Sequence, residues 1–274
     1  MRSALIAGIA ASLGAIIQGR SVTNTVGSGI VFGEIQELQA FSILLVASVL
    51  VIGSVVSKYP MPTAFTVVGA VVGSAFSFNN SVNWGSLQRI VLYWLAIPFL
   101  AVVIGYSLSK LLRKYVSKKR SKKKIRYLTL TMGLLVAYTS GANSVGLAVG
   151  PLKNLDFSIV LLLILGSVSI LIGAWVFSPK IIDAVSFEYS NVGPRRSAAA
   201  LGTAALLAQV GILLGIPISF SEAIIASVIG SGLVVGKSNI GKRKMAVTTG
   251  AWIGAFFLSA LLTYLLGNGL QYLL

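Results

Sequence analysis

The chain has 274 residues, of which 56% are hydrophobic and only 10% carry a charge, and its mean hydropathy is +0.91. A water-soluble domain has about a quarter charged residues, so this composition excludes a soluble enzyme, a disordered chain and a disulfide scaffold. The 22 Lys and Arg against 6 Asp and Glu give a net charge of +16, and His and Cys are absent. The usual ligands of zinc, haem and iron–sulfur sites are therefore missing, and we predict neither a metal nor a cofactor.

Long uncharged stretches recur along the whole chain. A helix needs about 20 apolar residues to cross a bilayer, and backbone groups in lipid must find their hydrogen bonds within the segment. Strand alternation at the spacing of a membrane barrel is absent. We therefore predict an all-α polytopic membrane protein, with the lipid bilayer as its surroundings. The uncharged stretches are 3–19, 38–57, 59–88, 90–109, 127–152, 157–179, 197–221 and 245–274.

Lys and Arg gather in one segment near the middle, where residues 110–126 read KLLRKYVSKKRSKKKIR. The positive-inside rule places such a loop in the cytoplasm, against anionic lipid. A nucleic-acid partner is not expected, because the basic run lies between two membrane segments. The segment divides the chain into a first transmembrane repeat (1–112), a basic cytoplasmic loop (113–126) and a second repeat (127–274).

The two halves share a pattern of Pro, Gly and Trp. Pro60 is followed thirteen positions later by Gly73, and Pro217 is followed thirteen positions later by Gly230. A polar loop and a long Trp-bearing helix follow each segment, with Trp94 in the first half and Trp252 in the second. The Gly69-x-x-x-Gly73 spacing is typical of close helix packing in lipid.

The corresponding polar loops differ in charge, which predicts that they lie on opposite faces of the membrane. Residues 79–88 carry no charge, whereas residues 237–244 carry four Lys or Arg. Equivalent elements on opposite faces form an inverted repeat, which is typical of secondary transporters with broken or re-entrant helices. Each half then crosses an odd number of times, so we expect both termini outside a cell membrane. Segments 19–35, 60–78 and 218–236 either cross the bilayer or re-enter.

Four polar breaks in the apolar stretches are expected to converge on one small anion. A helix that begins in mid-membrane exposes N–H groups and a partial positive charge, and Ser, Thr and Asn add neutral donors. The breaks lie at 21–25, 62–63, 141–144 and 217–221. The candidate substrate-binding residues in them are Ser21, Asn24, Thr25, Thr63, Asn143, Ser144, Ser219 and Ser221.

Two of these breaks carry motif-like sequences. Residues 141–151, GANSVGLAVGP, resemble the motif G-A-N-D-V-A-N-A-x-G-P, which the inorganic phosphate transporter family of sodium- or proton-coupled phosphate and sulfate permeases carries in each half. Residues 21–25, SVTNT, are similar to D-V-A-N-S in the other copy. Residues 217–222 are similar to the family's P-x-S-T-T-H, with Glu222 in place of His. The resemblance implies uptake of phosphate or a like oxyanion such as sulfate, driven by sodium or a proton, and a homodimer.

The chain departs from that family pattern at its charged positions. Ser21 and Ser144 stand where the motifs have Asp, and because hard cations prefer carboxylate oxygen, this weighs against sodium as the coupling ion. Arg20 is a candidate for a fixed positive charge that binds the oxyanion, or else an anchor at the interface. Glu222 is the proton-coupling candidate, a partner for Arg20, or a residue at a helix N-terminus in an aqueous vestibule.

The alternative is a membrane-embedded enzyme such as a lipid pyrophosphatase. Hydrolysis of a phosphate ester would use an acidic pair to hold a metal, and Glu34 and Glu37 are the only close acidic pair. A loop rich in Arg and Ser, as such an enzyme would use to hold phosphate, is missing. We therefore predict a permease without catalytic residues.

Overall fold

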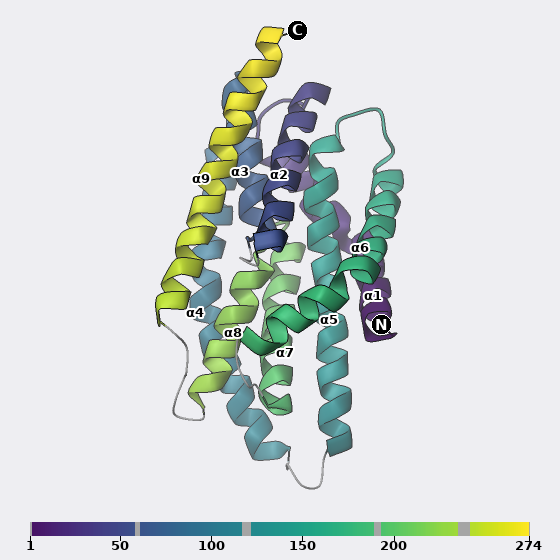
Figure 1. The fold of residues 1–274 in the computed structure, drawn as a ribbon, viewed down its shortest axis with the longest axis vertical. Helices are drawn as coiled ribbons and strands as arrows, with labels where there is room; N and C mark the ends of the chain where they lie inside the picture. The colour runs from purple at the N-terminus through teal and green to yellow at the C-terminus, as the bar shows by residue number, and fades with distance from the viewer. Residues whose placement is uncertain (1, 58–60, 117–121, 189–192, 235–241, 274) are drawn as a thin grey trace.

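Figure 1 shows the fold as a computed structural model, which describes residues 2–57, 61–116, 122–188, 193–234 and 242–273. Within those residues, seven helices are long and apolar enough to cross a membrane. Two further helices, α3 and α8, are shorter. The helices are α1 (Arg2–Asn24), α2 (Glu37–Ser57), α3 (Thr63–Ser77), α4 (Trp84–Tyr115), α5 (Lys122–Val149), α6 (Ile159–Glu188), α7 (Pro194–Leu213), α8 (Phe220–Leu233) and α9 (Lys242–Leu273).

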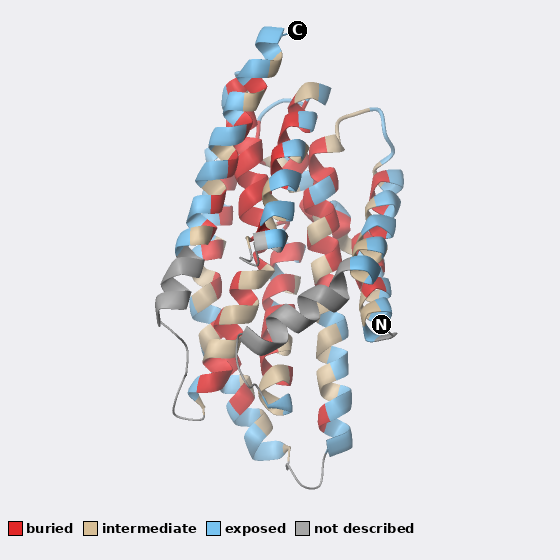
Figure 2. Cartoon of the chain, viewed as in Figure 1, coloured by how far each residue is buried: buried red, intermediate tan, exposed pale blue. Residues whose placement is uncertain are grey.

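The outer surface of the bundle is apolar, as the predicted membrane location requires. Large side chains such as Phe99, Trp175 and Phe257 are exposed on α4, α6 and α9. Figure 2 shows the buried residues gathered where helices face one another and the exposed residues on the outside. A surface of this kind is stable against lipid tails and unstable against water. The polytopic all-α prediction is thus confirmed.

The helices α3 and α8 are too short to cross a bilayer alone. They have 15 and 14 residues, which at 1.5 Å per residue gives about 22 and 21 Å against a hydrocarbon core of about 30 Å. Helix α3 follows Pro62 and α8 follows Ser219, and both of these preceding residues have an extended backbone. Figure 1 shows α3 beside α2 in the upper half of the bundle and α8 beside α7 in the lower half.

The other two expected breaks differ from the prediction. Helix α5 is continuous through residues 141–144, and α1 is continuous through residues 21–24. The chain then forms a π-helical turn, η1 (Thr25–Gly29), in which the Ile30 N–H donates to the Thr25 carbonyl over 3.0 Å. Gly141 lies within α5 without interrupting it. Its lack of a side chain allows α1 to pack closely on α5, because a Cβ at this position would collide with the backbone of Ala11.

Helix α1 packs between α5 and α6 with different directions against each. Gly14 meets the backbone of Tyr138, and Val26 meets Gly150, so α1 and α5 run in the same direction. Against α6 the direction is opposite, because Gly8 lies near Leu171 and Gly19 near Leu163. Helix α1 therefore runs along the bundle in the same direction as α5 and opposite to α6.

The short helices pack on the long helices of the other half in two matching pairs. A Cβ on Gly73 of α3 would collide with the carbonyl of Ala260 on α9, and a Cβ on Gly230 of α8 would collide with the carbonyl of Val102 on α4. Gly69 meets Phe256 of α9 in the same way. The Gly69-x-x-x-Gly73 pair is thus a packing surface, as its spacing predicts.

The basic segment is shorter as a loop than the sequence suggests. Helix α4 continues to Tyr115 and α5 starts at Lys122, so helices enter the predicted loop 113–126 from both sides. Residues 117–121 lie outside the described residues. We call this end of the bundle, the lower end in Figure 1, the basic end.

Candidate functional site

The connection between α7 and α8, residues 214–219, lies against α1, α4 and α5, and we call it the central junction. It starts with a turn in which Gly215 has φ +69°, a left-handed conformation that favours glycine. The Gly215 N–H donates to the Ile212 carbonyl over 3.0 Å, and the Ile216 N–H donates to the Gly211 carbonyl over 2.8 Å. These bonds satisfy the last turn of α7 and release the chain in an extended form toward α8.

Asn143 of α5 holds the central junction by its backbone. Its Nδ2 donates to the Ile218 carbonyl over 3.0 Å, and its Oδ1 accepts from the Ile218 N–H over 2.8 Å. The side chain is 2% exposed. A primary amide satisfies the backbone of an extended residue much as a neighbouring strand would, which lets an irregular segment exist away from water. The sequence motif at 141–151 is therefore in direct contact with the break at 217–221.

Trp94 of α4 supports the same segment from another side. Its Nε1 donates to the Pro217 carbonyl over 2.8 Å, and both residues lie in the interior. The indole ring stacks on Phe65, two residues after the start of α3, with a centroid distance of 3.9 Å and an angle of 17°. Through this stack, the beginning of α3 contacts the helix that holds the central junction.

Helix α1 brings hydroxyl groups to the turn of the central junction. Thr25 Oγ1 lies 2.9 Å, and Ser21 Oγ 3.5 Å, from the position that a Cβ on Gly215 would occupy. Both side chains are half-buried. Nearby, Gln209 Nε2 of α7 donates to Gln18 Oε1 of α1 over 3.1 Å. Neutral polar groups from the two helices thus meet within an apolar bundle.

The first turn of α8 closes the central junction. Ser219 is the N-cap, and its Oγ accepts from the Glu222 N–H over 3.4 Å. Ser219 is 1% exposed and Glu222 is 5% exposed, whereas Ser221 is half-buried. Glu222 Oε2 is buried without a hydrogen-bond partner among the described residues. A polar cap and an acidic group at this place match the partial positive charge of a helix N-terminus.

The remaining predicted site residues differ in their exposure. Arg20 and Asn24 are exposed on α1, and Asn24 accepts from Ser28 Oγ through its backbone carbonyl. Ser144 and Thr63 are half-buried. No group of three His, Cys, Asp or Glu that could hold a metal occurs among the described residues.

Three positions around the central junction were not predicted as site residues. Gly215 is recognisable only by its positive φ, and a single glycine in a chain with 29 of them gives no signal. Gln18 and Gln209 are detectable in principle, because isolated amides in apolar helices are costly unless they are paired. Their pairing across α1 and α7 depends on the tertiary structure.

Comparison with known proteins gives consistent matches over nearly the whole chain. The model of the phosphate transporter family matches residues 1–263. A sulfate permease of Bacillus subtilis (strain 168), CysP, is 28% identical over 262 residues, which cover 92% of this chain and 73% of that protein. A solved structure described as the sodium-dependent phosphate transporter superposes with a TM-score of 0.83 at 19% identity, covering 98% of this chain and 88% of the other.

Proposed function

This chain belongs to the phosphate transporter family and is a permease for phosphate or sulfate, and on that premise we propose that the anion binds at the central junction. The observation that carries the proposal is the convergence of α1, α4 and α5 on residues 214–219 through Thr25, Trp94 and Asn143. The alternative of a lipid pyrophosphatase is excluded, because the family consists of transporters.

The groups around the central junction suit a tetrahedral oxyanion. Ser21, Thr25, Ser219 and Ser221 supply hydroxyl donors, and the first turn of α8 adds backbone N–H groups and a partial positive charge. The Nδ2 and Oδ1 atoms of Asn143 both form hydrogen bonds with the backbone of Ile218. The main role of Asn143 in this proposal is therefore to position the central junction, and it does not bind the anion by itself. Thr63 and Ser144, both half-buried, and Asn24 remain candidate binding residues.

Coupling to a proton is better supported by the residues present than coupling to sodium. Ser21 and Ser144, at the two motif positions, carry no carboxylate, and hydroxyl oxygens alone hold sodium poorly. Glu222 is a buried carboxyl at the start of α8 with one unpaired oxygen, and an ionised carboxylate in that state is costly within a membrane. A proton bound with the anion would remove that cost on the way across.

Arg20 keeps the role of a fixed positive charge in this proposal, on α1 next to the hydroxyl groups of Ser21 and Thr25. Its side chain is exposed and directly precedes Ser21, so it can attract an anion toward the central junction before the hydroxyl groups bind it. A homodimer is implied by the family resemblance alone.

We infer an inverted repeat whose boundaries differ from the division at the basic loop. Helices α1 to α4 correspond to α6 to α9, and α5 lies between the two units. Three observations support this pairing: the matched contacts of α3 with α9 and of α8 with α4, the antiparallel packing of α1 on α6, and the reciprocal bonds of Ser12 and Ser167. In those bonds Ser12 Oγ donates to the Ser167 carbonyl over 3.0 Å and Ser167 Oγ donates to the Ser12 carbonyl over 3.3 Å.

The orientation follows from the charge of the basic end. Residues 110–126 and 237–244 carry most of the Lys and Arg, and the positive-inside rule places them in the cytoplasm of a cell membrane. Helix α1 runs in the same direction as α5, which starts at the basic end, and α9 ends at the opposite end (Figure 1). We therefore propose a cytoplasmic N-terminus and an external C-terminus.

Transport by the purified protein in liposomes tests this function. Uptake of radiolabelled sulfate or phosphate into liposomes is expected with an inward proton gradient and without sodium, and each anion should compete with the other. Strict dependence on a sodium gradient would refute the coupling proposal and leave the permease intact. Arg20→Gln should lower the rate at low anion concentration, with Arg89→Gln as the matched control, because Arg89 is an exposed arginine near the start of α4.

A further inference from the structure

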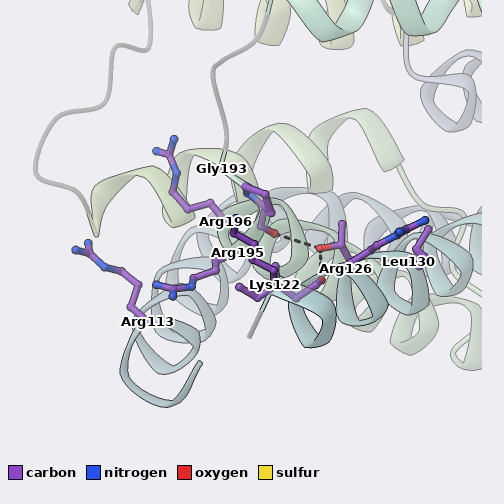
Figure 3. A pocket seen from close by; sticks show the side chains of 10 residues that line it. Arg113, Lys122, Arg126, Leu130, Gly193, Arg195 and Arg196 are labelled. Atoms are coloured by element: carbon purple, nitrogen blue, oxygen red, sulfur yellow. Dashed lines mark hydrogen bonds between the residues drawn. The ribbon is translucent and has the colours of Figure 1, made fainter. Parts of the chain in front are cut away.

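A separate cavity of about 710 Å³ lies at the basic end, between the end of α4 and the beginnings of α5 and α7. Figure 3 shows the side chains that line it. Along α7 this cavity is about 30 Å from the central junction, because Arg195 and Gly215 are twenty residues apart in sequence and a helix rises 1.5 Å per residue. It is therefore distinct from the transport site.

The described residues that line the cavity include five cationic side chains and no acidic one. They come from three helices that are distant in sequence: Arg113, Lys122, Arg126, Arg195 and Arg196. Like charges at this density repel one another, and the repulsion is relieved when an anion binds between them. Arg113 has one polar contact of its own, since its Nη1 donates to the Val234 carbonyl over 2.8 Å.

Arg195 carries the strongest indication of an anionic ligand. Its Nε and Nη2 are buried, and neither has a hydrogen-bond partner among the described residues. A guanidinium always carries its charge, so it cannot escape the cost of burial by losing a proton. Two adjacent unpaired N–H donors in a planar fork match the two oxygens of a phosphate group.

The other walls of the cavity are apolar. Ile125, Leu130 and Pro194 line it together with the cations, and Ile125 is 7% exposed. Helices α4 and α5 enter the basic end from the apolar part of the bundle, so the cavity lies where the membrane surface meets the cytoplasm. A ligand that fills such a space has an anionic head and an apolar part beside it.

We propose that this cavity binds the phosphate headgroup of an anionic phospholipid. The phosphate accepts hydrogen bonds from Arg195 and is neutralised by the surrounding cations, and the first part of an acyl chain lies against Ile125 and Leu130. Basic pockets between membrane helices on the cytoplasmic side are suited to such headgroups. The same phosphate chemistry is offered by the inorganic ion, which lacks the apolar part.

Thermal unfolding of the purified protein in a neutral detergent tests this site without any transport measurement. Dihexanoyl phosphatidylglycerol, dihexanoyl phosphatidylcholine and inorganic phosphate are titrated separately. A bound ligand raises the midpoint of unfolding in proportion to its occupancy. We expect the anionic lipid to raise the midpoint at concentrations at least tenfold below those needed for the zwitterionic lipid.

Arg195→Gln should weaken the effect of the anionic lipid at least fivefold, and Arg126→Gln should weaken it as well. The matched control is Lys114→Gln, which removes an equal charge from an exposed residue on the same end of α4 that does not line the cavity.

Equal effects of the two lipids would overturn the proposal. So would equal losses in Lys114→Gln and Arg195→Gln, which would indicate a diffuse attraction. Inorganic phosphate could also raise the unfolding midpoint at the same concentrations as the anionic lipid, and Arg195→Gln could remove that rise. This result would overturn the lipid proposal and show that the cavity binds the free anion. Because substrate transport is not measured, failure here leaves the permease proposal untouched.

Discussion

Asn143 and Ile218 are 75 positions apart in the sequence, and the side chain of the first pairs with both backbone groups of the second. The pair joins a continuous helix to an extended segment between two helices. Both hydrogen-bonding edges of the amide are used, so a side chain without a primary amide cannot reproduce this contact. The contact also explains why an Asn in an apolar helix is tolerated at a buried position.

Asn143→Asp should therefore abolish transport and lower stability. The substitution keeps the shape of the side chain but replaces the donor with a second oxygen that faces the Ile218 carbonyl. We expect a loss of about 2–4 kcal/mol in the free energy of unfolding, measured by chemical denaturation in detergent. Asn83→Asp is the matched control, because Asn83 caps α4 by accepting from the Ser86 N–H, and Asp caps equally well. Equal effects at both positions would contradict the role of Asn143.

Trp94→Phe should weaken the support of the central junction without removing an aromatic ring. The indole N–H to Pro217 is lost while stacking on Phe65 is largely kept. The Pro217 carbonyl is then buried without its donor, at a cost of about 1–3 kcal/mol, and the rate of sulfate or phosphate uptake should fall.

The control for Trp94 is Trp175→Phe, since Trp175 is 62% exposed on α6. We expect its thermal midpoint and uptake rate to stay near those of the original protein. A destabilisation by Trp175→Phe as large as that by Trp94→Phe would show that the loss comes from the ring and not from the hydrogen bond.

Gly215→Ala should impair transport more than stability. A left-handed backbone costs a non-glycine residue about 1–2 kcal/mol, and the added Cβ would approach Thr25 Oγ1 to 2.9 Å. The methyl group therefore enters the space between α1 and the central junction where we place the anion. Uptake assays should show a reduced apparent affinity for the anion.

Gly173→Ala is the matched control for that substitution. A Cβ on Gly173 meets nothing within 4 Å, and the residue lies inside α6. Alanine is favoured over glycine in a helix by up to about 1 kcal/mol. We expect an unchanged or slightly raised unfolding midpoint and normal uptake.

Glu222→Gln should remove the dependence of uptake on the proton gradient. The amide is close in shape to a protonated carboxyl and cannot release a proton, so the variant is expected to exchange anions without accumulating them. Counterflow of labelled anion and gradient-driven uptake are measured side by side. Glu37→Gln is the control, because Glu37 is exposed at the start of α2. Accumulation by Glu222→Gln that still follows the proton gradient would refute the proton role.

The sequence alone determined that the protein lies in a membrane, which helices are long and that Gly69 and Gly73 form a packing surface. These properties depend on the composition of contiguous segments and on the bilayer thickness, and both are readable along the chain. It also predicted that the polar breaks at 21–25, 62–63, 141–144 and 217–221 converge on one site. The family resemblance at those residues pointed to a permease, which the comparisons support.

Only the tertiary structure decided how those polar segments meet. Gly141 reads as a helix breaker in the sequence, yet α5 continues through it, because its missing side chain lets Ala11 approach. The partners of Asn143, Trp94 and Gln18 lie on other helices, and no local pattern encodes which carbonyl a side chain will reach. The direction of α1 relative to α5 likewise follows from interhelical packing, since a hydropathy pattern reads the same in both directions.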